Sequence, residues 1–154
     1  MSKPKFDLKN TYLAIINNSL GAKIFQTVFV KRNKTKTDVC DGGRLSCAVF
    51  VSYVLKLVDL IDTAHATVTS TIVDMEKTGW YKINREKVGS VLVWEEGDTS
   101  NGHQHIGFYI GNKKAISNSS KYGVPKMHHW TYGISKNKPK RQIKAMYWHN
   151  KLDM

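Results

Sequence analysis

The chain has 154 residues, of which 41% are hydrophobic and 23% charged, a composition typical of one folded domain with its own core. This excludes disordered, collagen-like and low-complexity proteins, and the longest uncharged apolar runs are too short to span a membrane. Lysine and arginine number 24 against 12 aspartate and glutamate residues, so the net charge of +12 favours anionic partners such as nucleic acid, acidic lipid surfaces or cell-wall polymers.

The N-terminus and the cysteines bear on where the protein acts. Asp7, Lys9 and Asn10 precede any apolar stretch, so we expect no secretory signal and a protein that is cytoplasmic or exported by a non-Sec route. Cys40 and Cys47 have a spacing that fits neither a disulfide framework nor a zinc-binding pair, and we treat them as two separate thiols. Nothing in the sequence selects an oligomeric state.

Helices are predicted in the N-terminal part of the chain. Apolar residues recur at helical spacing over residues 12–20, and Gly21 follows where helices often end. Residues 24–30 are β-rich, but their length does not separate a strand from a buried helix. Ser46 is a candidate N-cap, and helical periodicity as far as Ile61 predicts a helix of about four turns beginning at Cys47. We expect a shorter helix over residues 69–77.

Strands are predicted in the C-terminal part, where short β-like segments alternate with turns. Two polar, basic stretches, residues 31–37 and 135–141, are expected to be exposed loops. Helices followed by a strand meander indicate an α+β fold with an antiparallel sheet. The expected strands are residues 91–94, 105–110, 115–118, 129–132 and 145–148.

Cys47 and His105 are the candidate catalytic pair. A cysteine in the first turn of a helix meets unpaired backbone N–H groups and the positive end of the helix dipole, which stabilise a thiolate and can bind an oxyanion. A lone cysteine on an amphipathic helix is more often a small buried hydrophobe, so other residues must support the functional interpretation. His105 begins an alternating strand, and Gly107 leaves space beside it.

The order of cysteine helix, strand and histidine strand resembles the NlpC/P60 superfamily of papain-like cysteine peptidases and amidases, with its CHAP relatives. The matching segments are LSCAVFV at residues 45–51, VGSVLVW at 88–94 and HIGFYIG at 105–111. The chain departs from the usual pattern at Ser46 and Ser90, where family members have Asp.

The resemblance implies a papain-like α+β fold in which N-terminal helices, including the cysteine-bearing one, pack on an antiparallel sheet. It implies a single domain over residues 1–154, with the core motif region at about residues 38–133. Cys47 is then the nucleophile and His105 the general base and later the acid. The implied reaction is cleavage of an amide bond in peptidoglycan stem peptide or a related cell-wall amide, an anionic substrate.

Ser117 and Asn118 are the two candidates for the third catalytic residue. With a two-residue loop at residues 112–113, Gly107 faces Asn118, which then shares the face of His105. A three-residue loop selects Ser117, and the ungapped family match also favours Ser117, a position where relatives often carry His. We predict Asn118, because its amide oxygen can accept the imidazole N–H as the Asn of papain-type sites does.

Two other functions stay open. One is a polyanion-binding or nucleic-acid-binding module, in which basic residues 31–36 and 136–144 bind the partner and the Cys–His pair is vestigial. The other is a thiol-dependent acyltransferase, since an amine or alcohol can resolve an acyl-enzyme as well as water can.

We expect no cofactor and no metal. His103, His128 and His129 lie close in sequence to His105, but no matching carboxylate cluster accompanies them. His128 and His129 are instead expected to line a cleft or to pack with Trp130. Cys40 precedes a turn rather than opening a helix, so nothing predicts an activated thiol there.

Overall fold

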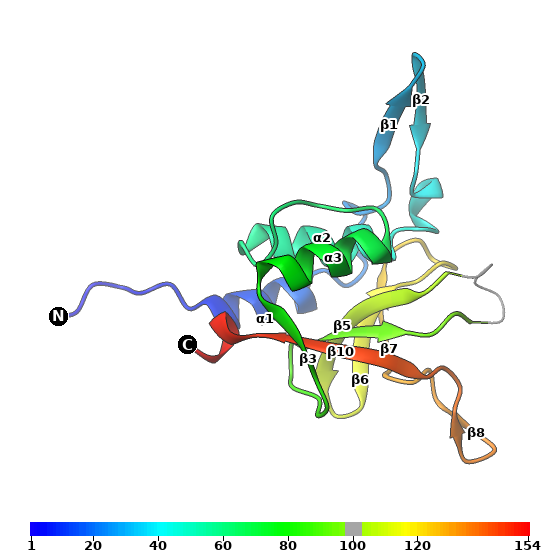
Figure 1. Ribbon diagram of the computed structural model, residues 1–154. Helices are drawn as coiled ribbons and strands as arrows, with labels where there is room; N and C mark the ends of the chain where they lie inside the picture. The colour runs from blue at the N-terminus through cyan, green and yellow to red at the C-terminus, as the bar shows by residue number, and fades with distance from the viewer. Residues whose placement is uncertain (98–102) are drawn as a thin grey trace.

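The computed structural model describes residues 1–97 and 103–154 and has an α+β fold (Figure 1). The helices are α1 (Leu8–Asn18), α2 (Cys47–Leu57) and α3 (Val68–Thr78), with the short 3-10 helices η1 (Asp41–Gly43) and η2 (Asn150–Asp153). The strands are β1 (Phe29–Arg32), β2 (Thr35–Asp38), β3 (Trp80–Ile83), β4 (Val91–Trp94), β5 (His105–Gly111), β6 (Lys114–Asn118), β7 (Pro125–His129), β8 (Ile134–Ser135), β9 (Lys138–Pro139) and β10 (Ile143–His149).

Six of these strands form one sheet in the order β3-β10-β4-β5-β6-β7. Every neighbouring pair in this sheet is antiparallel, which confirms the predicted antiparallel sheet. The β1–β2 and β8–β9 hairpins stand apart from it, and Figure 1 shows the β1–β2 hairpin, in blue and cyan, projecting from the body of the molecule. Within the described ranges, no helix is both long and apolar enough to cross a membrane.

The main core lies between the helices and one face of the sheet. Helix α2 is apolar around most of its circumference and packs against β5 and β6. The Phe50 ring of α2 meets the Phe108 ring of β5 edge to face at 5.4 Å, and Tyr12 of α1 meets the same ring at 5.8 Å. Buried aromatic pairs of this kind add roughly 0.5–1.5 kcal/mol to the gain from burial alone. This packing fixes the N-terminus of α2 relative to the sheet.

The opposite face of the sheet carries a second, smaller core. Side chains alternate along β4 and β5, so Leu92 and Trp94 point away from the helices and form a cluster with Tyr109 and Ala115. The segment between β7 and β10 closes over this cluster and contributes Trp130 and Tyr132, and Ile143 at the start of β10 also packs against it.

The structure corrects several predicted elements in the first half of the chain. Residues 31–37 form most of the β1–β2 hairpin instead of a loop, closed by Asn33 and Lys34 with φ of 48° and 70°. Two consecutive positive φ values are typical of the tight turn that suits a hairpin. Residues 24–28 lie outside the helices and strands. The helix beginning at Cys47 ends at Leu57, shorter than predicted, because Asp59 adopts a positive φ of 53°.

Two predicted strands in the second half also change. The strand expected at residues 129–132 is wrong: β7 precedes it and ends at His129, and the next residues turn. Part of the expected loop at 135–141 is the short β8–β9 hairpin. The edge strand β3 had no predicted counterpart, whereas the expected strand at residues 91–94 is confirmed as β4.

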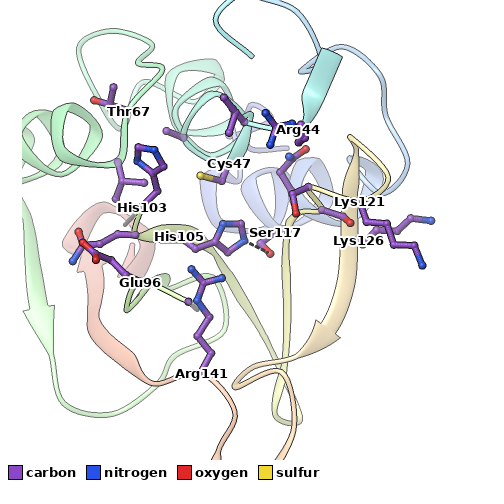
Figure 2. Close-up of a pocket in the computed structure, with 18 of the residues that line it drawn as sticks. Arg44, Cys47, Thr67, Glu96, His103, His105, Ser117, Lys121, Lys126 and Arg141 are labelled. Atoms are coloured by element: carbon purple, nitrogen blue, oxygen red, sulfur yellow. Dashed lines mark hydrogen bonds between the residues drawn. The ribbon is translucent and has the colours of Figure 1, made fainter. Parts of the chain in front are cut away.

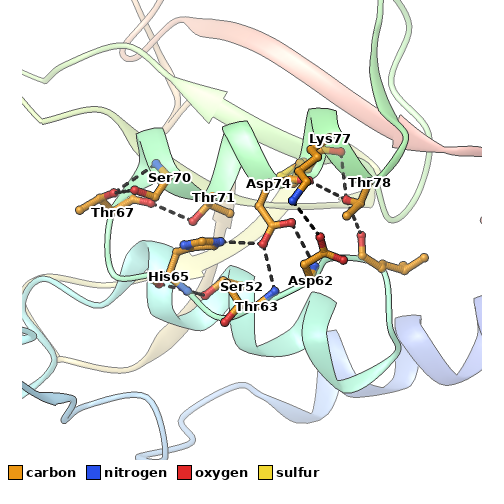
Figure 3. Close-up of polar contacts among 12 residues, drawn as sticks. Ser52, Asp62, Thr63, His65, Thr67, Ser70, Thr71, Asp74, Lys77 and Thr78 are labelled. Carbon is orange, nitrogen blue, oxygen red and sulfur yellow. Dashed lines mark hydrogen bonds and ion pairs between the residues drawn. The ribbon is translucent and has the colours of Figure 1, made fainter.

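A buried carboxylate holds the connection between α2 and α3 (Figure 3). Asp74 of α3 accepts hydrogen bonds from the backbone N–H groups of Asp62 and Thr63, each at 3.0 Å, and pairs with the His65 ring at 2.7 Å. Ser52 of α2 exchanges two 2.9 Å hydrogen bonds with the His65 backbone. These contacts fix a loop whose next residues line the pocket described below.

Candidate active site

A pocket of about 980 Å³ opens at the N-terminus of α2. It is lined by Cys47, by His105 and by both candidates for the third position, Ser117 and Asn118. Figure 2 shows the side chains of Cys47 and His105 directed into this pocket. The sequence-predicted residues therefore lie in one place, although their contacts differ from those expected.

Cys47 is the first residue of α2, as predicted. Ser46 occupies the N-cap position but makes no side-chain capping hydrogen bond, and its hydroxyl is buried without a partner among the described residues. Burial raises the pKa of the Cys47 thiol, and the backbone N–H groups of Ile106 and Ala48 act in the opposite direction. Cys47 and His105 line the same pocket, so the sulfur lies near the start of the histidine strand β5.

His105 and Ser117 meet across the space above Gly107. Residues 105 and 107 share a face of β5, and Gly107 pairs with Ser117 of β6, so the three positions lie on the same side of the sheet. A Cβ atom on Gly107 would approach both the Ile116 carbonyl oxygen and the Ser117 Cβ at 2.7 Å. With glycine there, the His105 Nε2 atom reaches the Ser117 hydroxyl at 2.8 Å.

The predicted contact between Asn118 and His105 is wrong, because β5 contains a bulge. The loop has two residues, Asn112 and Lys113, as the prediction assumed. However, the register shifts between Tyr109 and Gly111, where one extra residue enters β5. That single residue moves Gly107 from opposite Asn118 to opposite Ser117 and transfers Asn118 to the other face.

Asn118 instead ties β6 to the turn that precedes the cysteine helix. Its Nδ2 donates to the Gly43 carbonyl at 2.7 Å, and its side-chain oxygen has no partner among the described residues. Gly43 has a positive φ of 100° and lies so close to the Gly123 carbonyl that no Cβ fits. Asn118 therefore positions the chain leading to Cys47 and makes no contact with the imidazole of His105.

Ser117 connects His105 to a second histidine. The Ser117 hydroxyl oxygen lies 2.8 Å from His105 Nε2, 2.7 Å from His128 Nε2 and 3.1 Å from the Tyr132 hydroxyl. The Tyr132 ring stacks on the His128 ring at 4.1 Å. We refer to His105, Ser117 and His128 as the relay.

The hydrogen-bond partners fix the direction of the relay. His128 Nδ1 lies 2.7 Å from the His129 carbonyl, which only accepts, so Nδ1 carries the hydrogen. Burial lowers the pKa of His128, so its ring is neutral and its Nε2 accepts the one hydroxyl hydrogen of Ser117. The Ser117 oxygen then has only lone pairs left, and His105 must donate from Nε2. The other ring nitrogen of His105, Nδ1, is left as a free base.

Electrostatics set the protonation state of the catalytic pair. Burial, with the positive charge of Arg141 and the repulsion that a protonated His128 would add, lowers the pKa of His105 to about 3. Burial also raises the pKa of Cys47 above its ordinary value, although backbone hydrogen bonds and Arg141 act in the opposite direction. The raised pKa favours a neutral thiol over the predicted thiolate, because the effect of burial exceeds that of the backbone N–H groups and Arg141. At pH values between the pKa of His105 and that of Cys47, the two side chains together hold one titratable proton.

The remaining cysteine and histidines have other positions. Cys40 is fully buried outside the pocket. His129 Nδ1 accepts from the backbone N–H groups of Thr131 and Gly133, each at 3.2 Å, and so closes a turn. His103 lines the pocket. Across residues 1–97 and 103–154, no group of three or more His, Cys, Asp or Glu side chains is arranged to hold a metal ion.

Sequence reasoning missed the roles of Tyr132 and Arg141. Tyr132 donates to Ser117 and has a positive φ of 60°, and Arg141 lies in a stretch expected to be an exposed loop. His128 does line the pocket, as expected, but its bond to Ser117 was not predicted. The only available signal was the concentration of aromatic residues and histidine between residues 128 and 132.

No model of a known protein family matches the chain, and no curated protein matches it either. The geometry of this pocket is therefore the basis for inferring the function.

Proposed function

We propose that this protein is a thiol hydrolase that cleaves an amide bond, with Cys47 as nucleophile and His105 as general base and then acid. One observation carries the proposal: His105 Nε2 lies 2.8 Å from the Ser117 hydroxyl, in the pocket that also contains the Cys47 thiol. The bonds of Ser117 and His128 assign the imidazole hydrogen to Nε2, which leaves Nδ1 as a base. A buried histidine with only a structural role needs no such fixed tautomer beside a thiol.

The chemistry follows from these positions. His105 Nδ1 takes the thiol proton as the Cys47 sulfur attacks the substrate carbonyl carbon, and the unpaired N–H groups of the first turn of α2 face the developing oxyanion. The imidazolium then gives its proton to the leaving nitrogen, the C–N bond breaks, and a thioester forms. Water, deprotonated by His105, attacks the thioester; the carboxylic acid leaves and the proton returns to the sulfur.

We also propose that the fold is papain-like and related to the NlpC/P60 superfamily. The cysteine helix, the antiparallel sheet and the histidine at the start of β5 occur in the order that the resemblance implies. Relatives often carry His at the position of Ser117, and here His128 brings an imidazole next to that position. The proposed substrate is a cell-wall amide such as peptidoglycan stem peptide, whose anionic character suits the net charge of +12.

The test of the catalytic pair is alkylation of each cysteine by iodoacetamide, followed by peptide mass. We expect Cys47 to react faster than the buried Cys40 and to lose this advantage in His105→Ala. His103→Ala is the matched control, since it removes another pocket imidazole and should leave the rate unchanged. The proposal is contradicted if Cys47 stays unreactive in the folded protein, or if its rate of alkylation is unchanged in His105→Ala.

A product assay on purified wall fragments tests the substrate. The proposal expects new amine and carboxyl termini with wild type and none with Cys47→Ala. An added amine acceptor distinguishes hydrolysis from acyl transfer, because a transferase would give the conjugate in preference to the free acid.

A second function, polyanion binding, is favoured by the β1–β2 hairpin. Its strands are exposed along nearly their whole length and carry Lys31, Arg32 and Lys36, with Lys34 at the turn. Such a surface binds phosphate backbones in a strongly salt-dependent manner and without sequence preference. Binding to arbitrary DNA that is unchanged by Cys47→Ala and weakened by replacing these lysines would support this function.

A further inference from the structure

Arg141 is held rigidly at the side of the pocket. Its Nε donates to the Glu95 carbonyl at 2.9 Å, its backbone N–H donates to the Thr131 carbonyl at 3.0 Å, and its guanidinium carbon lies 5.7 Å from the centre of the Tyr132 ring. Figure 2 shows the guanidinium directed into the pocket, towards His105. Because the Arg141 side chain is already held in place, binding a ligand would cost it little further conformational entropy.

No carboxylate of residues 1–97 or 103–154 forms an ion pair with Arg141. The Glu95 carboxylate is directed to the backbone N–H of Gln142, at 3.0 Å. A partly buried guanidinium with no counter-ion among the described residues is costly. Its charge also acts on the catalytic groups: it adds to burial in lowering the pKa of His105 and partly offsets the rise that burial causes in the pKa of Cys47. The pocket therefore presents a fixed positive charge next to the thiol.

Other cations of the pocket reinforce this charge. Lys121 and Lys126 line it and lie 5.1 and 5.0 Å from the centre of the exposed Tyr122 ring, without carboxylate partners among the described residues. Arg44 differs, because Asp41 neutralises it through a 2.7 Å hydrogen bond. Glu96 is the one acidic residue among the described residues that line the pocket.

We propose that Arg141 binds a carboxylate of the substrate next to the scissile amide, so that the enzyme selects acidic acyl donors. Guanidinium nitrogens match the geometry of a carboxylate, and the bound anion would supply a counter-ion that residues 1–97 and 103–154 do not provide. This inference rests on the proposed function, since it assigns the specificity of the same pocket.

The test compares two alkylating reagents that differ in charge, iodoacetate and iodoacetamide. In both reactions the Cys47 sulfur forms a bond to carbon, iodide leaves, and the thiol proton passes to His105. Changes in thiol ionisation affect both reagents equally, so the ratio of their rates isolates the attraction for the carboxylate. We expect Arg141→Gln to lower the iodoacetate-to-iodoacetamide ratio at Cys47 about tenfold.

The control is Lys82→Gln, which removes one positive charge from the exposed face of β3, away from the pocket, and should leave the ratio unchanged. In wild type the ratio should also fall steeply between low and high salt, which needs no variant. A ratio that stays constant in Arg141→Gln or across salt, while both reagents still label Cys47, overturns the carboxylate site alone. Folded wild type in which neither reagent labels Cys47 overturns the proposed function, and this inference with it.

Discussion

Replacing Ser117 with alanine should disable His105 without removing it. Ser117→Ala deletes the hydroxyl that joins three groups, at 2.8 Å from His105, 2.7 Å from His128 and 3.1 Å from Tyr132. The His105 Nε2–H is then left without an acceptor in a buried site. An unpaired buried donor costs about 1–3 kcal/mol, so the ring shifts its hydrogen to Nδ1, where it can no longer take the thiol proton.

The free-energy cost of the unpaired His105 N–H determines how far the reactivity of Cys47 falls. At about 1.4 kcal/mol for each factor of ten, the population of the active tautomer falls about 5- to 150-fold. The assay is the rate of Cys47 alkylation by iodoacetamide between about pH 5 and pH 8. In wild type we expect a plateau there, because the pKa of His105 is lowered to about 3 and that of Cys47 is raised, so the pair keeps one proton throughout. Ser117→Ala should lower this plateau by the same factor.

Two variants make the result specific. Ser90→Ala removes another fully buried hydroxyl, one with no partner among the described residues, and should leave the plateau unchanged. Asn118→Ala breaks only the bond to Gly43, so it should reduce thermal stability and change the plateau by less than about threefold. A plateau that survives in Ser117→Ala but disappears in Asn118→Ala would refute both the register and the relay.

Three further predictions follow from the same structure. His105→Gln should abolish the plateau, so that Cys47 alkylation rises about tenfold per pH unit towards the raised pKa of the thiol; a remaining plateau would exclude His105 as the base. Asp74→Asn should cost about 1–3 kcal/mol of unfolding free energy at neutral pH, measured by urea titration. Burial raises the pKa of Asp74, but hydrogen bonds from His65 and two backbone N–H groups bring it below its ordinary value. The stability that the ionised carboxylate contributes is therefore present above about pH 4 and is lost as pH falls through the lowered pKa. Acid sensitivity that is identical in wild type and Asp74→Asn would contradict that assignment. Gly43→Ala should lower the melting temperature, because its Cβ collides with the Gly123 carbonyl; an unchanged melting curve would argue against this close approach.

The sequence predicts which helix and strands form the site better than it predicts the register in which the strands pair. Periodicity and turn residues placed Cys47 at the start of a helix and His105 at the start of a strand, since both signals are local. The bulge between Tyr109 and Gly111 has no local signal, because Asn112 and Lys113 form the two-residue turn that an unbulged hairpin would also use. One inserted residue was enough to exchange the roles of Ser117 and Asn118.

The roles of two further pocket residues were missed for a different reason. Tyr132 and Arg141 lie outside the regular strands, and only the closure of residues 130–143 over the second core brings them to the pocket. Contacts of this kind depend on tertiary packing, which a pattern of hydrophobic and polar residues does not encode.

The β1–β2 hairpin also has a consequence for local unfolding. Its strands bury almost no side chain, so the hairpin can open without exposing the core, and its amide hydrogens should exchange much faster than those of β5. At its base, however, the Asp38 carboxylate accepts from the N–H groups of Val28, Cys40 and Gly42, on the segment that leads into the cysteine helix. The boundary between the fast-exchanging arm and the slow-exchanging core therefore lies within a few residues of the nucleophile.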